Sequence, residues 1–540
     1  MRHNYVIFLN FVIFVNLSNY NKLLTYLKLC VKINLMAKIL RKIPATMATQ
    51  HPDHGQKPFW HSHSLIPTVE EARECFLSYN DLNIEEYMWD WEGKLVDESV
   101  MERLVAKHFK YFQKNQIGKQ KFLTFRLPNP KVQEEFRVSR AIMGILTAAG
   151  LARQLNLHSP PLFEVILPMT ESAEEIIAIQ EAFDEMACLR HPLNRMENNC
   201  DMFLELIPLF ETVKTIIHSS DILEKYLTLY RHAFKKTPVY LRPFVARSDP
   251  ALNSGLVPTV LAIKIALSRY SKFEKKHKLK LFPVIGVGSL PFRGGLSPFY
   301  TEDFVTEYSG VKTATIQSAF RYDYKKPLVK NAVSFLNKTL PRKKAKLIAP
   351  SEERDLIALL HYFEKPYQES IEHIAPIINE VSGYIPKRRE RVQHIGLFGY
   401  SRGVGKVKLP RAISFTGALY SLGIPPELIG TGRGLAQIKK LGRQKLLEKY
   451  YLNFKKDLIK AGGFLYKPGL EALAKKHLAF REIWNDVQEI EKYLIDELGP
   501  KTTEEKAHYK LCEKLHLQLK TKKPLTHIIE RQAVLRHSMG

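Results

Sequence analysis

The stretch that decides the fold class is Val239-Tyr-Leu-Arg-Pro-Phe-Val-Ala-Arg-Ser-Asp-Pro-Ala-Leu-Asn-Ser-Gly255. It begins as an apolar run of the kind that forms a buried strand, and it stops on a single carboxylate, Asp249. Pro250 cannot extend a sheet, and Gly255 permits the turn that follows. A helical pattern then runs to Tyr270. The stretch therefore predicts a strand followed by a helix, with an acidic group at the tip of the strand.

The same pattern occurs upstream in Leu206-Ile-Pro-Leu-Phe-Glu-Thr212, where an apolar run ends on Glu211. If the two strands are parallel neighbours, Glu211 and Asp249 can converge on one hard cation. Sites for Mg²⁺ or Mn²⁺ that keep open positions for a phosphorylated substrate have this form. The alternative interpretation is that each carboxylate only caps the helix after its strand.

Past residue 45, short apolar runs alternate with stretches of helical periodicity. One helix is predicted over Thr170–Leu189, with Ser172 as its N-cap. This alternation predicts an α/β fold, a (β/α)₈ TIM-type barrel elaborated with many additional helices. His51 lies ahead of the first candidate strand, which begins at Glu86. The eight candidate strands are Glu86–Trp91, Lys121–Arg126, Leu162–Pro168, Phe203–Phe210, Val239–Ala246, Leu281–Val287, Lys312–Gln317 and His394–Phe398.

Three regions are predicted along the chain. Residues 36–430 form the catalytic barrel, and residues 431–540 form a helical region that packs on the barrel or at a subunit contact. Residues 1–35 form an extension that we expect to lie upstream of the true start, because a second methionine, Met36, follows it. Its apolar run from Tyr5 to Val15 is too short to span a bilayer, although a membrane anchor is the alternative.

The composition is that of a folded globular chain, with 45% hydrophobic and 11% aromatic residues. The formal net charge of +26 raises the possibility of nucleic-acid binding, but the charge is spread along the chain and no nucleic-acid motif is present. We expect a lysine-rich surface, a cytoplasmic protein and neither nucleic acid nor membrane as a partner. The cysteines form no CxxC pair and fit reduced thiols. They are Cys30, Cys75, Cys188, Cys200 and Cys512.

Arginines follow several of the candidate strands and favour an anionic substrate. Arg126 ends its strand, and Arg293 lies in the glycine-rich loop 286–295, which lacks the lysine of a Walker loop. Arg402 and Arg411 flank a glycine-containing turn and could hold one phosphate between them. The alternative for that turn is a solvated basic loop. The loop 286–295 is predicted to be a mobile lid, because its glycines permit unusual backbone conformations.

An ordered set of motifs resembles the archaeal-type phosphoenolpyruvate carboxylase family. The resemblance covers roughly residues 40–430, and the order of the motifs makes it specific although each is weak alone. The motifs are Thr49-Gln-His-Pro-Asp53, Tyr87-Met-Trp-Asp-Trp-Glu-Gly-Lys94, Phe125-Arg-Leu-Pro-Asn-Pro130, Val165-Ile-Leu-Pro-Met-Thr170, the Glu211 strand, Ala246-Arg-Ser-Asp-Pro-Ala251, Pro291-Phe-Arg-Gly294, Gly399-Tyr-Ser-Arg402 and Leu409-Pro-Arg-Ala-Ile-Ser-Phe-Thr-Gly417.

The resemblance implies a lyase, a homotetramer by analogy, that uses Mg²⁺ or Mn²⁺ to join phosphoenolpyruvate and bicarbonate into oxaloacetate and phosphate. Glu211 and Asp249 match the metal-binding residues of the family. His51 matches its essential histidine. By position in the motifs and at strand ends, the catalytic set is His51, Arg293, Arg402 and Arg411, and the substrate-binding set is Arg126, Lys94 and Gln317.

The chain departs from the longer branch of the family at two places. Leu252 stands where that branch has a lysine after the metal aspartate, and Ile285-Gly-Val287 replaces its His-Gly-Arg. Lys94 is the candidate to replace the lost cation.

Two other functions stay open. A magnesium-dependent barrel lyase or aldolase acting on pyruvate-like substrates is one, although it needs no arginine cluster for inorganic phosphate. A basic RNA-binding protein is the other, and its affinity would fall steeply with salt.

Overall fold

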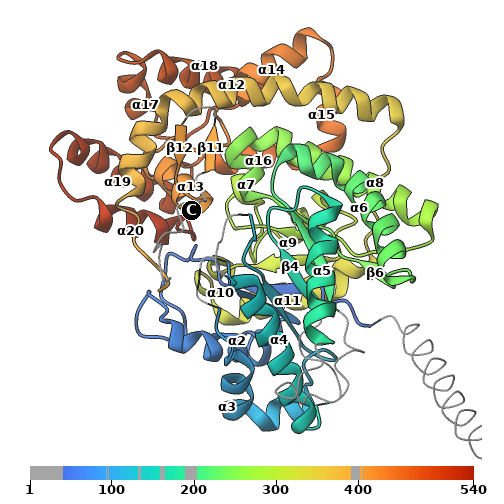
Figure 1. Ribbon diagram of the computed structural model, residues 1–540. Helices are drawn as coiled ribbons and strands as arrows, with labels where there is room; N and C mark the ends of the chain where they lie inside the picture. Colours follow the sequence, from blue (N-terminus) through green and yellow to red (C-terminus); the bar gives the residue numbers. More distant parts are fainter. Residues whose placement is uncertain are drawn as a thin grey trace, which may run out of the picture.

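The computed structural model describes residues 41–92, 94, 96–131, 136–157, 164–188, 204–390, 402–404 (as backbone) and 407–540. Within them a closed barrel of parallel strands is ringed by helices, and further helices lie over one end of it (Figure 1). No helix in this part of the chain is long and apolar enough to cross a membrane. Cys75, Cys188 and Cys512 form no disulfide bond.

The barrel has eight strands, all paired in parallel, in the order β1-β10-β9-β7-β5-β4-β3-β2. This confirms the predicted (β/α)₈ fold class. The strands are β1 Thr46–Thr49, β2 Glu86–Asp90, β3 Phe122–Arg126, β4 Glu164–Leu167, β5 Glu205–Phe210, β7 Phe244–Ala246, β9 Val284–Gly286 and β10 Thr313–Ile316.

Seven of these strands lie inside predicted runs, and the eighth is β1, which the sequence interpretation missed. β1 closes the barrel by pairing with both β10 and β2. It is only Thr-Met-Ala-Thr, too short and too polar to stand out as an apolar run. The predicted strand His394–Phe398 lies outside the described residues.

Two predicted strands are each divided by a proline, which has no N–H to donate to a sheet. Pro243 separates β6 Tyr240–Leu241 from β7, and Pro283 separates β8 Lys280–Leu281 from β9. β6 and β8 pair with each other outside the barrel.

The barrel interior is filled by a separate apolar cluster, and its N-terminal end is closed by a buried ionic group. Arg242 donates to Glu86 (Nη2–Oε2 2.7 Å) and to Glu164 (Nη1–Oε2 2.5 Å). Burial alone would lower the pKa of Arg242, but the two carboxylates raise it above its usual range. The apolar cluster is Met47, Met88, Ile166, Ile207, Leu209, Phe244, Ala246 and Val284.

The helices around the barrel follow local sequence signals. Ser172 accepts a hydrogen bond from the Glu175 N–H and caps α5 as predicted. The helices up to the end of the barrel are α2 Glu71–Asn80, α3 Val100–Lys114, α4 Arg137–Gln154, α5 Ala173–Ala187, α6 Val213–Phe234, α7 Ser248–Ser254, α8 Leu256–His277, α9 Thr301–Glu307, α10 Ser318–Tyr322 and α11 Lys326–Thr339.

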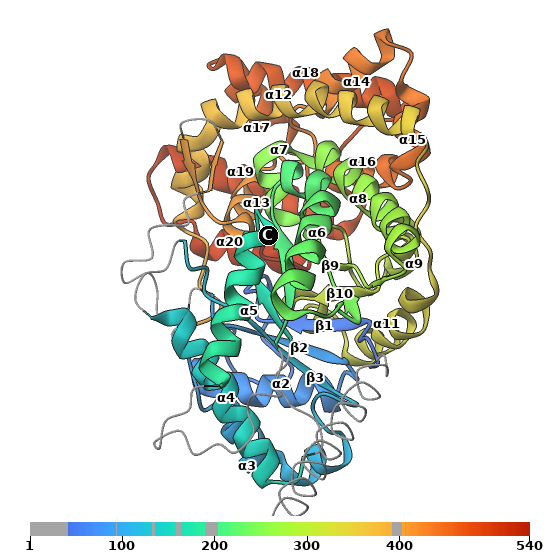
Figure 2. The ribbon, with the colours of Figure 1, turned by 45° about the vertical axis from the view of Figure 1, so that its right-hand side comes forward.

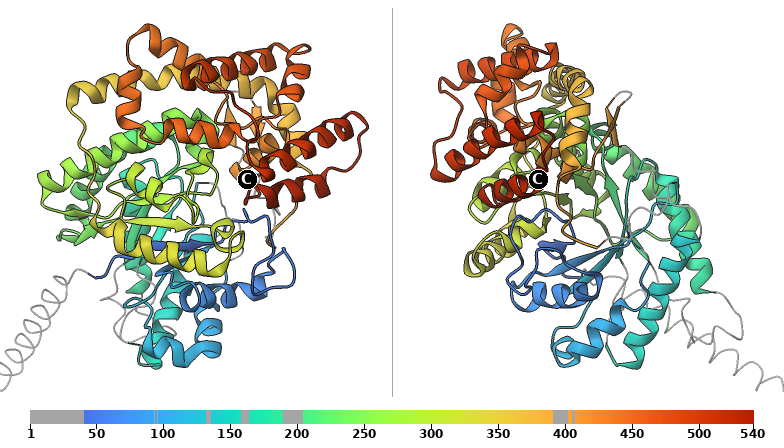
Figure 3. Two further views of the ribbon diagram at one scale, coloured as in Figure 1. Left: turned by 180° about the vertical axis from the view of Figure 1, so that it is seen from behind. Right: turned by 90° about the vertical axis from the view of Figure 1, so that its left-hand side faces the viewer.

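A long helix, α12 Pro350–Ser382, joins the barrel to the later helices (Figures 2 and 3). It packs against α7 and α8 of the barrel and against α13, α14 and α18. The hairpin of β11 Arg402–Val404 and β12 Val407–Leu409 also contacts it. The later helices are α13 Ala412–Ser421, α14 Thr431–Lys440, α15 Gln444–Tyr450, α16 Phe454–Gly462, α17 Lys467–Ala474, α18 Leu478–Leu494, α19 Thr503–Lys520 and α20 Thr526–Leu535.

Candidate active site

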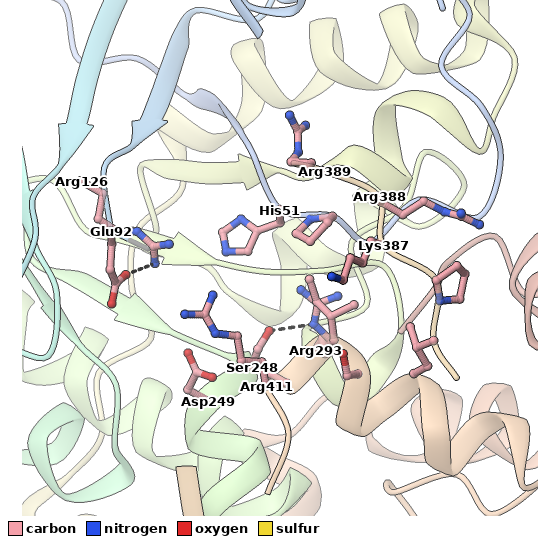
Figure 4. A pocket seen from close by; sticks show the side chains of 16 residues that line it. His51, Glu92, Arg126, Ser248, Asp249, Arg293, Lys387, Arg388, Arg389 and Arg411 are labelled. Atoms are coloured by element: carbon pink, nitrogen blue, oxygen red, sulfur yellow. Dashed lines mark hydrogen bonds and ion pairs between the residues drawn. The ribbon is translucent and has the colours of Figure 1, made fainter. Parts of the chain in front are cut away.

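Two adjoining cavities lie at the C-terminal ends of the barrel strands. The outer cavity has a volume of about 240 Å³ and is lined from the barrel, from the segment after α12 and from the start of α13. The inner cavity, about 40 Å³, reaches into the barrel. Four residues line both, namely His51, Arg126, Ser248 and Asp249. Figure 4 shows these side chains around one opening. Catalytic groups of TIM-type barrels lie at this end.

The two predicted metal ligands line the same inner cavity. Glu211 follows β5 and accepts the N–H of Met169 (2.7 Å), while Asp249 lies in the first turn of α7, directly after β7. β5 and β7 are parallel neighbours, as the metal hypothesis required. Neither carboxylate serves as a helix N-cap, since Thr212 caps α6 and Arg247 precedes α7.

The donor set fits a hard divalent cation with open positions. Two carboxylates supply oxygen ligands, and no group of three or more metal-binding side chains occurs among the described residues. A cation held by Glu211 and Asp249 would therefore take its remaining ligands from substrate and water, as Mg²⁺ commonly does.

His51 lies just after β1, at the mouth of the barrel, and not ahead of the first strand. Because β1 is a barrel strand, the residues after it reach the same mouth as Asp249. The ring is oriented by a 2.8 Å hydrogen bond between Nδ1 and the Thr49 hydroxyl. This bond holds the imidazole in one orientation in the wall of both cavities.

Arg126 lines both cavities but is held by two carboxylates. Its Nε and Nη2 donate to Asp90 (2.9 and 2.8 Å), and Nη1 pairs with Glu92 (2.8 Å). Burial by itself would lower the pKa of Arg126, but Asp90 and Glu92 raise it well above its usual range. This arrangement fixes the guanidinium as a permanent positive charge beside Glu211.

Arg293 is buried, and protein groups occupy its guanidinium. It donates to Ser248 Oγ (3.1 Å) and to Gln317 Oε1 (2.6 Å), and it contacts Asp53 (3.3 Å) and the carbonyl of Gly540. Burial lowers its pKa, and Asp53 and Asp249 oppose that shift. Arg293 therefore links the Asp249 segment to the residues around it.

The loop 286–295 that carries Arg293 is packed and hydrogen-bonded in this structure, and its movement as a lid stays a prediction. Arg247 donates to the carbonyls of Phe292 (2.9 Å) and Pro291 (3.3 Å). From the other side, Glu427 accepts the Phe292 N–H (2.7 Å) and the Tyr420 hydroxyl (2.6 Å). A Cβ at Gly294 would lie 2.5 Å from Val287, so glycine at this position permits the close packing.

Glu427 should make stability depend on pH. Burial raises its pKa from 4.5 to about 7. The carboxyl therefore stabilises the fold below pH 4.5, and this contribution is lost as the pH rises towards 7. The amide of Glu427→Gln does not titrate. Between these pH values the free energy of unfolding of the wild type should fall by about 3 kcal/mol relative to that variant. Urea denaturation at a series of pH values measures this difference, and parallel profiles would contradict the assignment.

Residues 538–540 enter the barrel mouth beside Arg293. The Met539 N–H donates to the carbonyl of Asp53 (2.6 Å), and the Asp53 carboxylate accepts the Ala319 N–H (2.8 Å). A Cβ on Gly540 would lie 1.9 Å from the Ile413 carbonyl oxygen and 2.6 Å from the Gly417 nitrogen. Only glycine fits this position.

Gly540→Ala should therefore lower kcat/KM. The methyl group displaces residues 538–540 and with them the contact to Arg293, and a misplacement of about 1 Å in an active site can cost about 10²-fold. Steady-state kinetics checks the loss. Gly144→Ala is the matched control, because its Cβ would meet only Glu98 and Trp91 at ordinary distances of 3.5 and 3.6 Å. Equal activity of the two variants would show that residues 538–540 are not needed at the site.

The other predicted site residues divide into three groups. Gln317 lines the inner cavity and Arg411 the outer one. Lys94 lines neither, because its ammonium is buried between Glu71 (2.5 Å) and Gln50 (2.8 Å). It is therefore not placed to replace the lost cation. The backbone of Arg402 lies in β11, which contacts α7, and its side chain is outside the described residues.

Sequence reasoning missed the basic residues Lys387, Arg388 and Arg389, which line the outer cavity. Asp53, which contacts Arg293, was also missed as a site residue although it lies in a quoted motif. The sequence does contain a feature that could have revealed Lys387, Arg388 and Arg389. They are three consecutive cations after a proline, at the end of a long helical pattern.

Comparison with known proteins shows similarity over almost the whole chain. The family described as phosphoenolpyruvate carboxylase matches residues 43–540. The phosphoenolpyruvate carboxylase of Oenococcus oeni is 39% identical over 511 residues, which cover 94% of this chain and 100% of that protein. The enzyme of the same name from Leuconostoc mesenteroides is 37% identical over 504 residues, 93% and 99% of the two chains. That of Metallosphaera sedula is 38% identical over 520 residues, 93% and 100%.

Proposed function

The chain belongs to the phosphoenolpyruvate carboxylase family, and on this premise we propose that its two cavities carboxylate phosphoenolpyruvate with bicarbonate, giving oxaloacetate and phosphate. The observation that carries the proposal is the joint placement of Glu211, Asp249, His51 and Arg126 around one opening of the barrel. An enzyme with this activity is a carbon–carbon lyase, and it fixes inorganic carbon.

Glu211 and Asp249 would hold Mg²⁺ or Mn²⁺, which would supply positive charge next to the oxygens of phosphoenolpyruvate as negative charge develops. The chain's own residues do the rest. Arg126 holds a fixed positive charge beside this site, because Asp90 and Glu92 lock its guanidinium. Exposed Arg411 can bind the phosphoryl oxygens directly. Together these charges orient phosphoenolpyruvate and bicarbonate for phosphoryl transfer to give carboxyphosphate.

His51 would transfer the proton of carboxyphosphate when carboxyphosphate breaks into CO₂ and phosphate. Thr49 supports this role, because its hydroxyl holds the imidazole in one orientation through Nδ1. The enolate of pyruvate then attacks CO₂ at its methylene carbon. Water has to be excluded at this stage, because protonation of the enolate would give pyruvate. Arg293 of the packed loop 286–295 lies in the wall of the outer cavity, and the carbonyl of Gly540 accepts a hydrogen bond from it.

A coupled assay tests the proposal directly. Oxaloacetate should form only when phosphoenolpyruvate, bicarbonate and a divalent cation are all present, and one phosphate should appear for each oxaloacetate. Release of pyruvate without any need for bicarbonate would instead favour the alternative of a barrel lyase or aldolase.

We also propose that the enzyme is a cytoplasmic homotetramer that replenishes oxaloacetate for the tricarboxylic acid cycle. Within each subunit, residues 36–430 would carry the chemistry and residues 431–540 would support the barrel or a subunit contact. Support comes from α12, which contacts both barrel helices and later helices. Light scattering coupled to gel filtration tests the tetramer, and metal titration of the metal-free protein tests the preference between Mg²⁺ and Mn²⁺.

A further inference from the structure

The basic residues on the wall of the outer cavity fall into two groups that differ in burial. Arg126, Arg293, Arg388 and Arg389 contribute to the wall but are buried or nearly so. Lys387 and Arg411 line the same cavity and are exposed to solvent. The two groups therefore differ in how much of each side chain an entering ligand can contact.

The buried arginines after α12 are held by protein groups. Arg389 forms a two-pronged pair with Glu74 (2.7 and 2.6 Å). Arg388 donates to Ser64 Oγ (3.1 Å) and contacts Glu530 (3.2 Å). Turning Arg389 to a substrate would leave the buried carboxylate of Glu74 without this partner. Turning Arg388 would release the buried carbonyl of His54, to which its Nε donates (3.1 Å). Leaving such buried acceptors unpaired costs more than an exposed contact returns.

The backbone next to Lys387 is held by hydrogen bonds to Ile66. The Ile66 N–H donates to the Arg388 carbonyl (3.0 Å), and the Glu390 N–H donates to the Ile66 carbonyl (3.3 Å). Together with the side chains of Arg388 and Arg389, these bonds anchor residues 388–390. The flexible four-carbon stem of Lys387 therefore extends from an ordered base. Figure 4 shows it beside His51 and Arg293.

We propose that Lys387 is a substrate-binding residue, whose ammonium closes onto an oxyanion group of phosphoenolpyruvate in the outer cavity. The inference rests on the proposed function and adds a residue that the sequence motifs did not include. Leu252, which stands where a lysine was expected, is fully buried in the core and provides no such contact. The ammonium comes instead from the segment after α12, across the cavity from Asp249.

We assign the contact of Lys387 to phosphoenolpyruvate, and not to bicarbonate, because of the charge of phosphoenolpyruvate. It carries both a phosphate and a carboxylate, so it gains more than the smaller, singly charged bicarbonate from a cation added to an already basic wall. Bicarbonate has the same kind of oxygen atoms, however, and kinetic experiments can separate the two.

The experiment varies each substrate in turn for the full-length enzyme and for Lys387→Met. The variant should raise the KM for phosphoenolpyruvate about tenfold, as expected when a hydrogen bond to a charged group is lost. The KM for bicarbonate and the thermal midpoint should stay within about twofold and about 2 °C of the wild type, since truncating an exposed side chain has little effect on stability. Lys387→Arg should restore most of the affinity, because it returns the positive charge.

Lys408→Met is the matched control. Lys408 is an exposed lysine in nearby β12 that does not line the outer cavity, so its loss changes the net charge equally. Its KM values should match the wild type. The proposal is overturned if Lys387→Met leaves both KM values unchanged, if only the KM for bicarbonate rises, or if Lys408→Met has an equal effect. A wild-type enzyme that makes no oxaloacetate would instead refute the proposed function itself.

Discussion

The Asp249→Asn and Glu211→Gln variants should each lose at least about 10²-fold in kcat while keeping the wild-type fold. Each change removes a negative charge at nearly constant volume, so the packing around β5 and β7 is preserved. The affinity for the divalent cation should fall in parallel, because among the described residues the inner cavity is lined by only these two carboxylates. Steady-state kinetics, Mn²⁺ titration and thermal unfolding measure these three quantities.

Glu205→Gln is the control for this experiment. Glu205 lies at the opposite end of the same strand as Glu211 and lines neither cavity. Its replacement should leave the dependence of rate on metal concentration unchanged. If Asp249→Asn or Glu211→Gln kept more than about a tenth of the wild-type rate, that carboxylate would not be a metal ligand, because one lost transition-state contact costs about 10²-fold or more.

His51→Asn should separate carboxylation from the earlier phosphoryl transfer. The variant should still bind metal and phosphoenolpyruvate, and should still release phosphate slowly when bicarbonate is present. It should make little oxaloacetate and a larger share of pyruvate, since the proton of carboxyphosphate is no longer managed and the enolate is exposed to water. The loss of oxaloacetate should be about 10²-fold or more, typical of a missing general acid or base.

The ratio of oxaloacetate to phosphate is the decisive measurement for His51. A ratio that stays near that of the wild type while the rate falls would place His51 before phosphoryl transfer. Loss of metal binding would make it a ligand, and loss of stability alone would make it a structural residue. Thr49→Val tests orientation, because it removes the hydroxyl that holds Nδ1. It should shift the product ratio in the same direction but less strongly.

The sequence by itself determined most of the barrel. Strands such as β5 appear as apolar runs because both faces of a parallel sheet are buried. The positions of Glu211 and Asp249 followed from the points where such runs end. The Ser172 cap was also predictable, because a cap depends on residues only a few positions apart. Information of this kind is local, so the chain displays it without folding.

Only the tertiary structure decided the role of the short, polar segment β1. Its place in the barrel comes from pairing with β10, whose residues are far along the chain. Since His51 follows β1, the position of this histidine could not be derived from periodicity.

The tertiary structure likewise decided which charged residues are buried in ion pairs and which line the cavities. Lys94 forms an ion pair with Glu71 and does not line the cavities, whereas Arg389 pairs with Glu74 and lies in the wall of the outer cavity. The sequence shows which residues carry charge. It does not show which distant carboxylate becomes buried beside each one, and that pairing decides whether a cation supports the protein or can bind the substrate.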